Sequence, residues 1–201
     1  MKRVKRKVHK ARKENTVKKA YRETWNFIKD SRNFILLGLA IFLISALIGI
    51  LYPELFQKQI TEYLERVFDK VKDYNFLQTF GFILKNNISS SFFVVLWGIL
   101  LGIFPAIITV INGYVLGFVA VKSAEIAGPA ILLRLIPHGI FELPAIFISI
   151  GIGIRLGLAV FRERENYRYV LRETARVFIL WVVPLLIVAG IIEAALIIFS
   201  R

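Results

Sequence analysis

Cysteine is absent from this 201-residue sequence, and histidine occurs only twice. Without cysteine the chain has no disulfide, no thiolate metal site and no cysteine nucleophile, although this absence does not identify a compartment. The pattern of many zinc proteases, two histidines at i and i+4 with a glutamate between them, does not occur. A serine nucleophile elbow, a P-loop and a glycine-rich dinucleotide motif are missing as well. We therefore expect neither an enzyme nor a bound metal or cofactor.

Charged residues are absent from four long stretches, which are residues 34–52, 88–121, 143–154 and 177–192. Hydrophobic residues make up 57% of the chain, whereas soluble domains contain about 45–50% apolar residues even when glycine is counted. A helix needs about 20 apolar residues to cross a bilayer, and soluble helices rarely offer so many in succession. The composition therefore predicts an all-α, polytopic integral membrane protein.

The lengths of these stretches predict five spans in a single membrane domain, residues 34–201. As one helix, the uncharged run 88–121 would be roughly 50 Å long. Since the hydrocarbon core is only about 30 Å thick, this run must form two spans. The turn between them is placed at Phe104-Pro105, with Asn112-Gly113 as the alternative. The predicted spans are about 34–52, 88–104, 107–125, 136–160 and 177–199.

Positive charge is concentrated at the N-terminus. The net charge is +13, and residues 1–33 contain 13 Lys/Arg against three acids. We interpret this arm as a cytoplasmic segment with an interfacial helix on anionic lipid. Nucleic-acid binding is the alternative for such a segment and is not expected. The arginine-rich residues 161–176 fall on the same side, which predicts a plasma-membrane protein with the N-terminus inside and the C-terminus outside. No cleavable signal peptide is recognised, so residues 34–52 are expected to remain as an anchor.

An amphipathic helix is predicted between the first two spans, at about 54–74. Its apolar residues recur every three or four positions, and residues 53–87 carry five basic and five acidic residues. The helix either lies against the membrane and the other spans or presents a docking surface to a partner. Besides the lipid bilayer, we therefore expect protein partners through residues 1–33 or 53–87.

Glycines spaced four residues apart predict close helix packing. The pairs are Gly98/Gly102, Gly113/Gly117 and Gly153/Gly157. On a helix, each pair forms a flat surface that lets a neighbouring backbone approach, within one chain or across a dimer. We expect a homo-oligomer on this ground, and no catalytic role for these glycines.

The segment Pro137–Pro144 is the most unusual in the chain and predicts broken or re-entrant backbone at membrane depth. His138 and Glu142 are four residues apart, so one helical turn would place them on one face. Glu193, in the last span, is expected at a similar depth in the outer leaflet. Ionisable residues inside a membrane are functional candidates by default, so these three residues form the predicted polar cluster.

Three interpretations of this cluster remain open. In the first, His138 and Glu142 hydrogen-bond backbone groups freed by the prolines, and Glu193 is protonated or bonded across helices. In the second, the three residues form a path for protons or cations. In the third, they hold a metal for an intramembrane hydrolase, although the usual zinc-protease pattern is missing. Lipid binding or remodelling is a further possibility for the protein as a whole.

The sequence resembles the stage II sporulation protein M family of multi-span membrane proteins over about residues 85–200. The features that carry the resemblance are Asn86-Asn87, Gly98 and Gly102, Asn112-Gly113 with Gly117, the run Leu135-Ile-Pro-His-Gly-Ile-Phe-Glu-Leu-Pro-Ala145 with Pro137, Gly139 and Pro144, then Gly151, Gly153, Arg155-Leu-Gly157 and Ile192-Glu193-Ala194. The specific part is the run from Pro137 to Pro144.

The resemblance implies a scaffold that is not an enzyme. In sporulating bacteria, the family member helps to hold two cell-wall-degrading partners at the septal membrane during engulfment. Many relatives occur in organisms that do not sporulate. We therefore expect an integral membrane scaffold or assembly factor that organises partner proteins without catalysis. The alternative is a small proton- or cation-coupled transporter or permease-like component that uses His138, Glu142 and Glu193.

Overall fold

The computed structural model describes residues 16–98, 103–134 and 136–199, and within them every regular element is a helix. The helices are α1 (Thr16–Asp30), α2 (Arg32–Leu51), α3 (Gln57–Val71), α4 (Phe76–Trp97), α5 (Ile103–Ala127), α6 (Ile136–Arg162), α7 (Tyr167–Val177) and α8 (Val183–Phe199). Shorter pieces connect them, namely the 3₁₀ segments η2 (Pro53–Phe56), η3 (Pro129–Arg134) and η4 (Arg164–Asn166) and a π-helical turn, η5 (Phe178–Val182).

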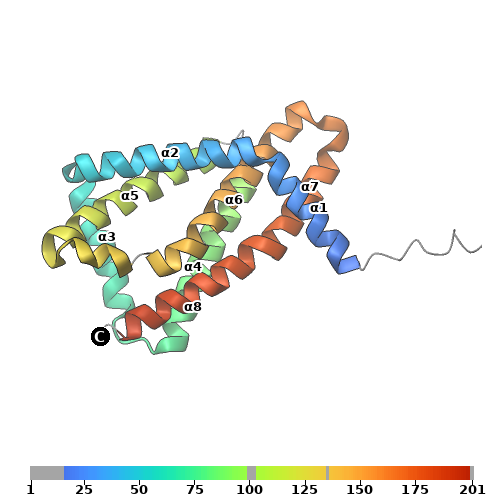
Figure 1. Cartoon of the computed structure of the whole chain (residues 1–201). Helices are drawn as coiled ribbons and strands as arrows, with labels where there is room; N and C mark the ends of the chain where they lie inside the picture. The colour runs from blue at the N-terminus through green and yellow to red at the C-terminus, as the bar shows by residue number, and fades with distance from the viewer. Residues whose placement is uncertain (1–15, 99–102, 135, 200–201) are drawn as a thin grey trace, which may run out of the picture.

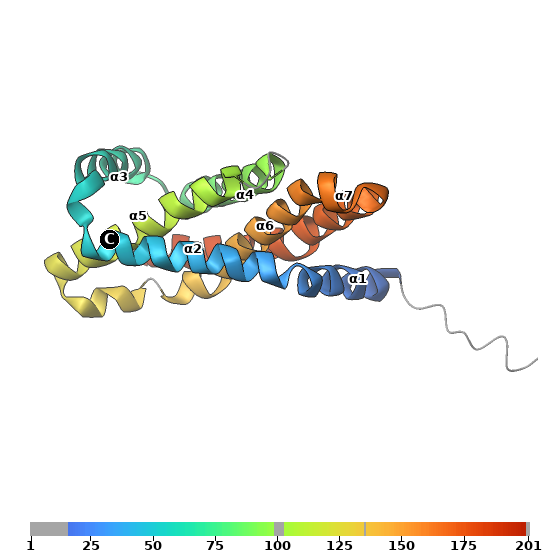
Figure 2. The same ribbon diagram turned by 90° about the horizontal axis from the view of Figure 1, so that it is seen from above.

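Five segments of the described chain are long and apolar enough to cross a membrane. They are α2, α4, α5, α6 and the continuous helical segment Tyr167–Phe199, which contains α7 and α8. This confirms the predicted all-α, polytopic class with about five transmembrane helices. Successive segments run in opposite directions, so α1 and α7 lie at one end of the bundle, whereas α3, η3 and the end of α8 lie at the other (Figures 1 and 2).

Helix α6 is the element around which the bundle is packed. It contacts α2, α4 and α8, and its buried residues run from Ala145 to Ala159. Near its start, Ala145 packs with residues of η5 and α8. Near its end, Ile152 and Leu156 pack with Phe27 of α1 and Val170 of α7. The same helix therefore holds the spanning bundle and the α1–α7 layer together.

Helices α2 and α5 approach each other closely enough to bring their backbones into contact. A Cβ atom at Gly113 would meet the carbonyl oxygen of Phe42, and one at Gly117 would meet that of Ala46. Gly49 of α2 is packed in the same way against the backbone of α5. Apolar helices gain no hydrophobic free energy by associating in lipid, so such close van der Waals contact is what holds them together.

Hydrogen bonds across the same contact satisfy polar groups without water. The hydroxyl of Ser45 in α2 donates to the carbonyl of Val110 in α5. The hydroxyl of Tyr114 in α5 donates to the carbonyl of Tyr52, just after α2, over 2.7 Å. The second bond caps the end of α2 with a group from its neighbour.

Helices α4 and α6 cross at glycines as well. A Cβ atom at Gly98, directly after α4, would overlap the backbone of Gly153, and one at Gly153 would lie 2.9 Å from the carbonyl oxygen of Val94. Gly157 is buried in α6, and Gly102 lies outside the described residues. These contacts are within one chain, and a homo-oligomer stays a prediction.

Helix α4 begins at Phe76, well before the predicted span at 88–104. The side chain of Asn75 accepts a hydrogen bond from the backbone N–H of Gln78 over 3.0 Å, and the Gln78 side chain accepts one from the N–H of Asn75 over 2.9 Å. This capping box starts a helix that continues through Lys85 to Trp97. The prediction was wrong here because it was based on the uncharged run alone and so left out the polar half of the helix.

Helix α4 ends at Trp97 and α5 begins at Ile103, directly before Phe104-Pro105. The alternative turn at Asn112-Gly113 is wrong, because both residues lie inside α5. Pro105 is the third residue of α5, where its missing N–H breaks no bond of the helix.

The broken backbone expected at Pro137–Pro144 is not seen, because α6 is one helix from Ile136 onward. Pro137 is its second residue, a position where proline fits. Pro144 lies inside the helix, where neighbouring helices can compensate for the lost bond. The interruption lies before α6 instead, where η3 folds back onto α5.

The N-terminal helix α1 packs against α7. Arg176 of α7 donates hydrogen bonds to Glu23 of α1 over 3.0 Å and to Glu173, whose side chain is fully buried, over 2.9 Å. The indole N–H of Trp181 donates to the hydroxyl of Thr24 over 2.9 Å. The apolar face of α1 that the sequence assigns to lipid is therefore partly covered by protein.

Arg155 joins α6 to the same layer. Its guanidinium lies over the ring of Phe27, 4.2 Å from the ring centroid, and donates to the hydroxyl of Ser31 over 3.2 Å. It also forms an ion pair with Glu163 over 3.4 Å. Only 12% of the Arg155 side chain is exposed, so this charge is held by protein at the junction of α1 and α2.

Replacing Gly117 by alanine should destabilise the protein, because the added Cβ overlaps the carbonyl of Ala46 and pushes α2 away from α5. Overpacking of this kind costs about 1–3 kcal/mol, which a thermal unfolding assay in detergent would register as a lower melting temperature. Gly81 has open space around its Cβ position, so Gly81→Ala is the control. It should be neutral or slightly stabilising, because alanine favours a helix over glycine by about 1 kcal/mol. Equal melting temperatures for both variants would contradict the α2–α5 contact.

Replacing Arg155 by methionine should loosen the junction of α1 and α2. The stem of the side chain remains, but the hydrogen bonds of the charged group are lost at a cost of about 1–3 kcal/mol. Hydrogen exchange should then become faster in residues 27–31, and the melting temperature should fall. Arg162→Met, in the exposed last turn of α6, is the control. Unchanged exchange in Arg155→Met would show that Arg155 does not hold this junction.

Candidate functional site

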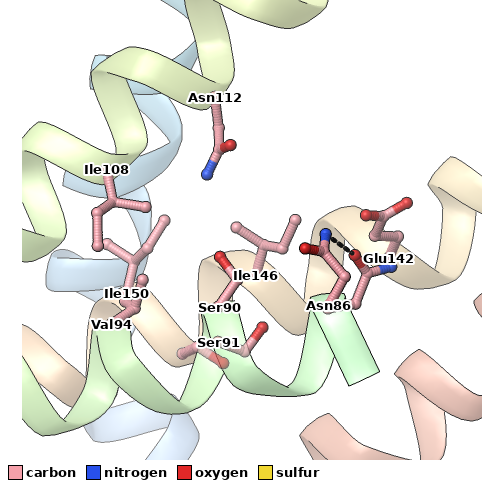
Figure 3. A pocket seen from close by; sticks show the side chains of 11 residues that line it. Asn86, Ser90, Ser91, Val94, Ile108, Asn112, Glu142, Ile146 and Ile150 are labelled. Atoms are coloured by element: carbon pink, nitrogen blue, oxygen red, sulfur yellow. Dashed lines mark hydrogen bonds between the residues drawn. The ribbon is translucent and has the colours of Figure 1, made fainter. Parts of the chain in front are cut away.

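A polar cavity of about 160 Å³ lies between α4, α5 and α6 (Figure 3). Its polar lining residues are Asn86, Asn87, Ser90 and Ser91 of α4, Asn112 of α5, and Glu142 and Ser149 of α6. Aliphatic side chains, those of Val94, Ile108, Ile146 and Ile150, complete the lining. Figure 3 shows Asn112 pointing from α5 toward the side chains of α4 and α6. A membrane bundle thus encloses a hollow lined mainly by amides and hydroxyls.

An apolar groove of about 620 Å³ adjoins this cavity and is bordered by α2, α5, η3 and α6. Its apolar lining residues are Phe42, Val115, Leu116, Val119, Ala120, Leu132, Ile136, Ile140, Leu143 and Ile146, together with Gly139. Its polar lining residues are Asn112, His138 and Glu142. Asn112, Glu142 and Ile146 line both hollows, so the polar cavity and the apolar groove meet at these residues.

Two buried polar atoms around these hollows have no hydrogen-bond partner within the part of the chain that the structure describes. They are Nδ2 of Asn87 and Nδ1 of His138. Asn86 donates to Oδ1 of Asn87 only over 3.5 Å, whereas Ser149 donates to the carbonyl of Ala145 over 2.9 Å. A buried polar group without a partner is costly in hydrocarbon. The cavity therefore has unused capacity to bind water or a polar ligand.

The predicted polar cluster is only partly brought together. Glu142 lines both hollows and His138 lines the groove. Glu193 of α8 lines neither, but it is close enough to Glu142 for an electrostatic interaction. Among residues 16–98, 103–134 and 136–199, no three His, Asp or Glu side chains are grouped as metal ligands. These positions give no support to the interpretation of the cluster as a metal site.

The motif residues fall on both sides of these hollows. Gly139 lines the groove on α6, and its Cβ position meets only Cδ1 of Leu143, at 4.0 Å. Pro137 and Pro144 are exposed in α6. Gly113 is buried against α2, whereas the preceding Asn112 faces the cavity. Two neighbouring residues of α5 thus have different roles, because Gly113 packs against α2 and Asn112 lines the cavity.

Sequence reasoning missed the contribution of α4 to the site. Asn87, Ser90 and Ser91 were not predicted as site residues, because the charge-free run was interpreted only as apolar. A signal was present, since Asn86-Asn87 and three successive serines stand inside an otherwise hydrophobic stretch. A membrane helix with a polar face usually turns that face toward protein or toward a cavity.

The model of the family described as stage II sporulation protein M matches residues 38–196. An uncharacterized protein of Methanocaldococcus jannaschii is 30% identical over 123 residues, which is 57% of this chain and 53% of that relative. The chain thus spans about half the length of the curated relative it matches. No solved structure matches. Neither match carries a name that points to transport.

The family model covers most of the chain and overlaps all five described segments that are able to span a membrane. The residues from which the resemblance was inferred, from Asn86 to Glu193, lie within the match. This chain belongs to the stage II sporulation protein M family.

Proposed function

We propose that this protein is an integral membrane scaffold or assembly factor that organises partner proteins without catalysis. Its membership of the stage II sporulation protein M family supports this proposal. The observation that carries it is the uncovered apolar face of α3, at the end of the bundle opposite α1 and α7 (Figure 2).

Helix α3 leaves several of its apolar side chains without a cover in the described chain. Ile60 is buried against Tyr114 and Phe118 of α5, but Leu64 and Phe68, one turn apart on one face, are 37% and 66% exposed. Glu62 and Asp69 lie on the opposite side of the helix, as its period requires. Exposed apolar patches of this kind mark interaction sites for proteins or membranes. We assign this face, within residues 53–87, to a protein partner.

The proposed site of action is the cell membrane, with the N-terminus in the cytoplasm. Helix α1 and the arginine-rich residues 161–176 share one end of the bundle (Figure 1), as the positive-inside rule requires if that end is cytoplasmic. Helix α3 then faces outward and meets partners on the outer side. A homo-oligomer of such units would present several α3 helices to them.

A photo-crosslinking amino acid at Phe68 or Leu64 should capture a partner protein in the native host membrane. We expect both positions to give the same partner band, because both lie on the uncovered face. Mass spectrometry would identify the protein in that band. Glu62, on the polar side of α3, is the matched control and should give no such band. If both apolar positions cross-link only to lipid or to copies of this chain, the partner role of α3 is wrong.

The orientation can be measured with single cysteines, because the natural chain has none. Glu62→Cys in α3 should react with a membrane-impermeant maleimide in intact cells. Lys18→Cys in α1 should react only after the cells are permeabilised. Both side chains are exposed, so access of the reagent decides the outcome. The reverse labelling pattern would place α3 in the cytoplasm and would contradict the proposed orientation.

A further inference from the structure

The polar cavity lies in the middle of the membrane domain, and the apolar groove extends from there toward the end of the bundle that carries η3. Phe42, which is halfway along α2, lines the groove and packs edge-on against Phe147 of α6, with 5.3 Å between ring centroids. Glu142 lies little more than one turn before Phe147 on the same helix. The hollows are therefore at the level of the hydrocarbon core, where the surrounding medium is lipid.

The groove opens toward this hydrocarbon. Ile136 and Ile140 line it and remain 52% and 60% exposed, so its rim is apolar. A water-soluble ligand would have to cross lipid to enter between such side chains. A molecule that already resides in the bilayer can slide in sideways, with its hydrocarbon chain against Val115, Leu116 and Val119.

The inner wall of the groove has a different chemistry. Asn112 and Glu142 stand where the groove meets the cavity, and the amides and hydroxyls of α4 lie behind them. The cavity volume of about 160 Å³ has room for several water molecules or for a small polar end group. One hollow thus suits a hydrocarbon chain and the other suits the polar end of the same molecule.

The charge of the lining restricts that polar end. No lysine or arginine is among the described side chains that line either hollow, and Glu142 is an acid at their junction. A phosphate or carboxylate placed there would face this acid without a counter-charge, which disfavours its binding. Hydroxyl groups, in contrast, can donate to Glu142 and exchange hydrogen bonds with the asparagines and serines.

We propose that the α5–α6 groove and the adjoining cavity bind a neutral membrane lipid with a hydroxyl-bearing polar end, such as an acylglycerol. The hydrocarbon chain lies along the groove, and the hydroxyls occupy the cavity beside Glu142 and Asn112. The site uses different residues from the proposed partner surface on α3, so either proposal can fail without the other.

The test uses the full chain reconstituted in lipid nanodiscs and a monoacylglycerol that carries a photoactivatable diazirine in its acyl chain. Wild-type protein should be labelled on α5 and α6 peptides, and excess unlabelled monoacylglycerol should suppress the labelling. Labelling that does not saturate, or that is spread over all lipid-facing helices, would overturn the proposal.

A matched pair of glycine variants tests whether the lipid chain occupies the groove. Gly139 lines the groove and has space for a side chain, so Gly139→Leu should occupy the groove without disturbing α6 and should reduce labelling by about tenfold. Gly81→Leu places the same side chain in open space on α4 and should label like the wild type. Both variants should elute as the wild type does in size-exclusion chromatography. Equal labelling of the two variants would contradict a site in this groove.

The polar end is tested with a diazirine lysophosphatidic acid of the same acyl chain, which differs by a phosphate. The wild type should label about tenfold more strongly with the monoacylglycerol, because the phosphate faces Glu142. Glu142→Gln keeps the shape but removes the charge, so this preference should shrink. If the wild type labels equally with both probes, or if Glu142→Gln leaves the preference intact, the proposed headgroup chemistry is wrong.

Discussion

The structure depends on the fact that apolar helices gain no hydrophobic free energy from each other inside a bilayer. Association then requires backbones to come close enough for dense van der Waals contact. Gly113 and Gly117 of α5 meet the backbone of α2, and Gly98 meets Gly153 of α6. These contacts join α5 to α2 and α4 to α6, and α2 borders the groove at Phe42. The hollows between the helices are therefore set by where the glycines allow close approach and where larger side chains prevent it.

Polar groups in the bundle are divided between two regions with different roles. At the end that carries α1 and α7, Arg155, Arg176 and Glu173 have partners within the chain and hold α1 in place. Within the described residues, buried polar atoms without a partner occur at that end, in Glu173 and Thr174, and beside the hollows, in Asn87 and His138. The first region is mainly a structural network. The second adjoins a cavity and a groove that can hold a ligand, which is why the lipid site is proposed there.

Much of the fold was predictable because the bilayer leaves few alternatives. Long uncharged runs must be helices, since lipid cannot satisfy an open backbone, and this predicted five spans. The start of α4 was missed because a capping box at Asn75, not hydropathy, begins that helix. The helix around Pro137 was missed because proline in a first turn removes no hydrogen bond. Composition shows neither effect, since both depend on where a residue stands in its helix.

The sequence by itself determined the class of protein, the number of spans and the glycines able to pack closely. It also singled out Glu142 and His138, because ionisable residues are rare in a membrane and therefore conspicuous. Only the tertiary structure decided what surrounds them. Glu142 shares its cavity with Asn86 of α4 and Asn112 of α5, residues far apart in the chain that meet because three helices cross there. Hydropathy is a local property, whereas a cavity exists only between helices once they are packed.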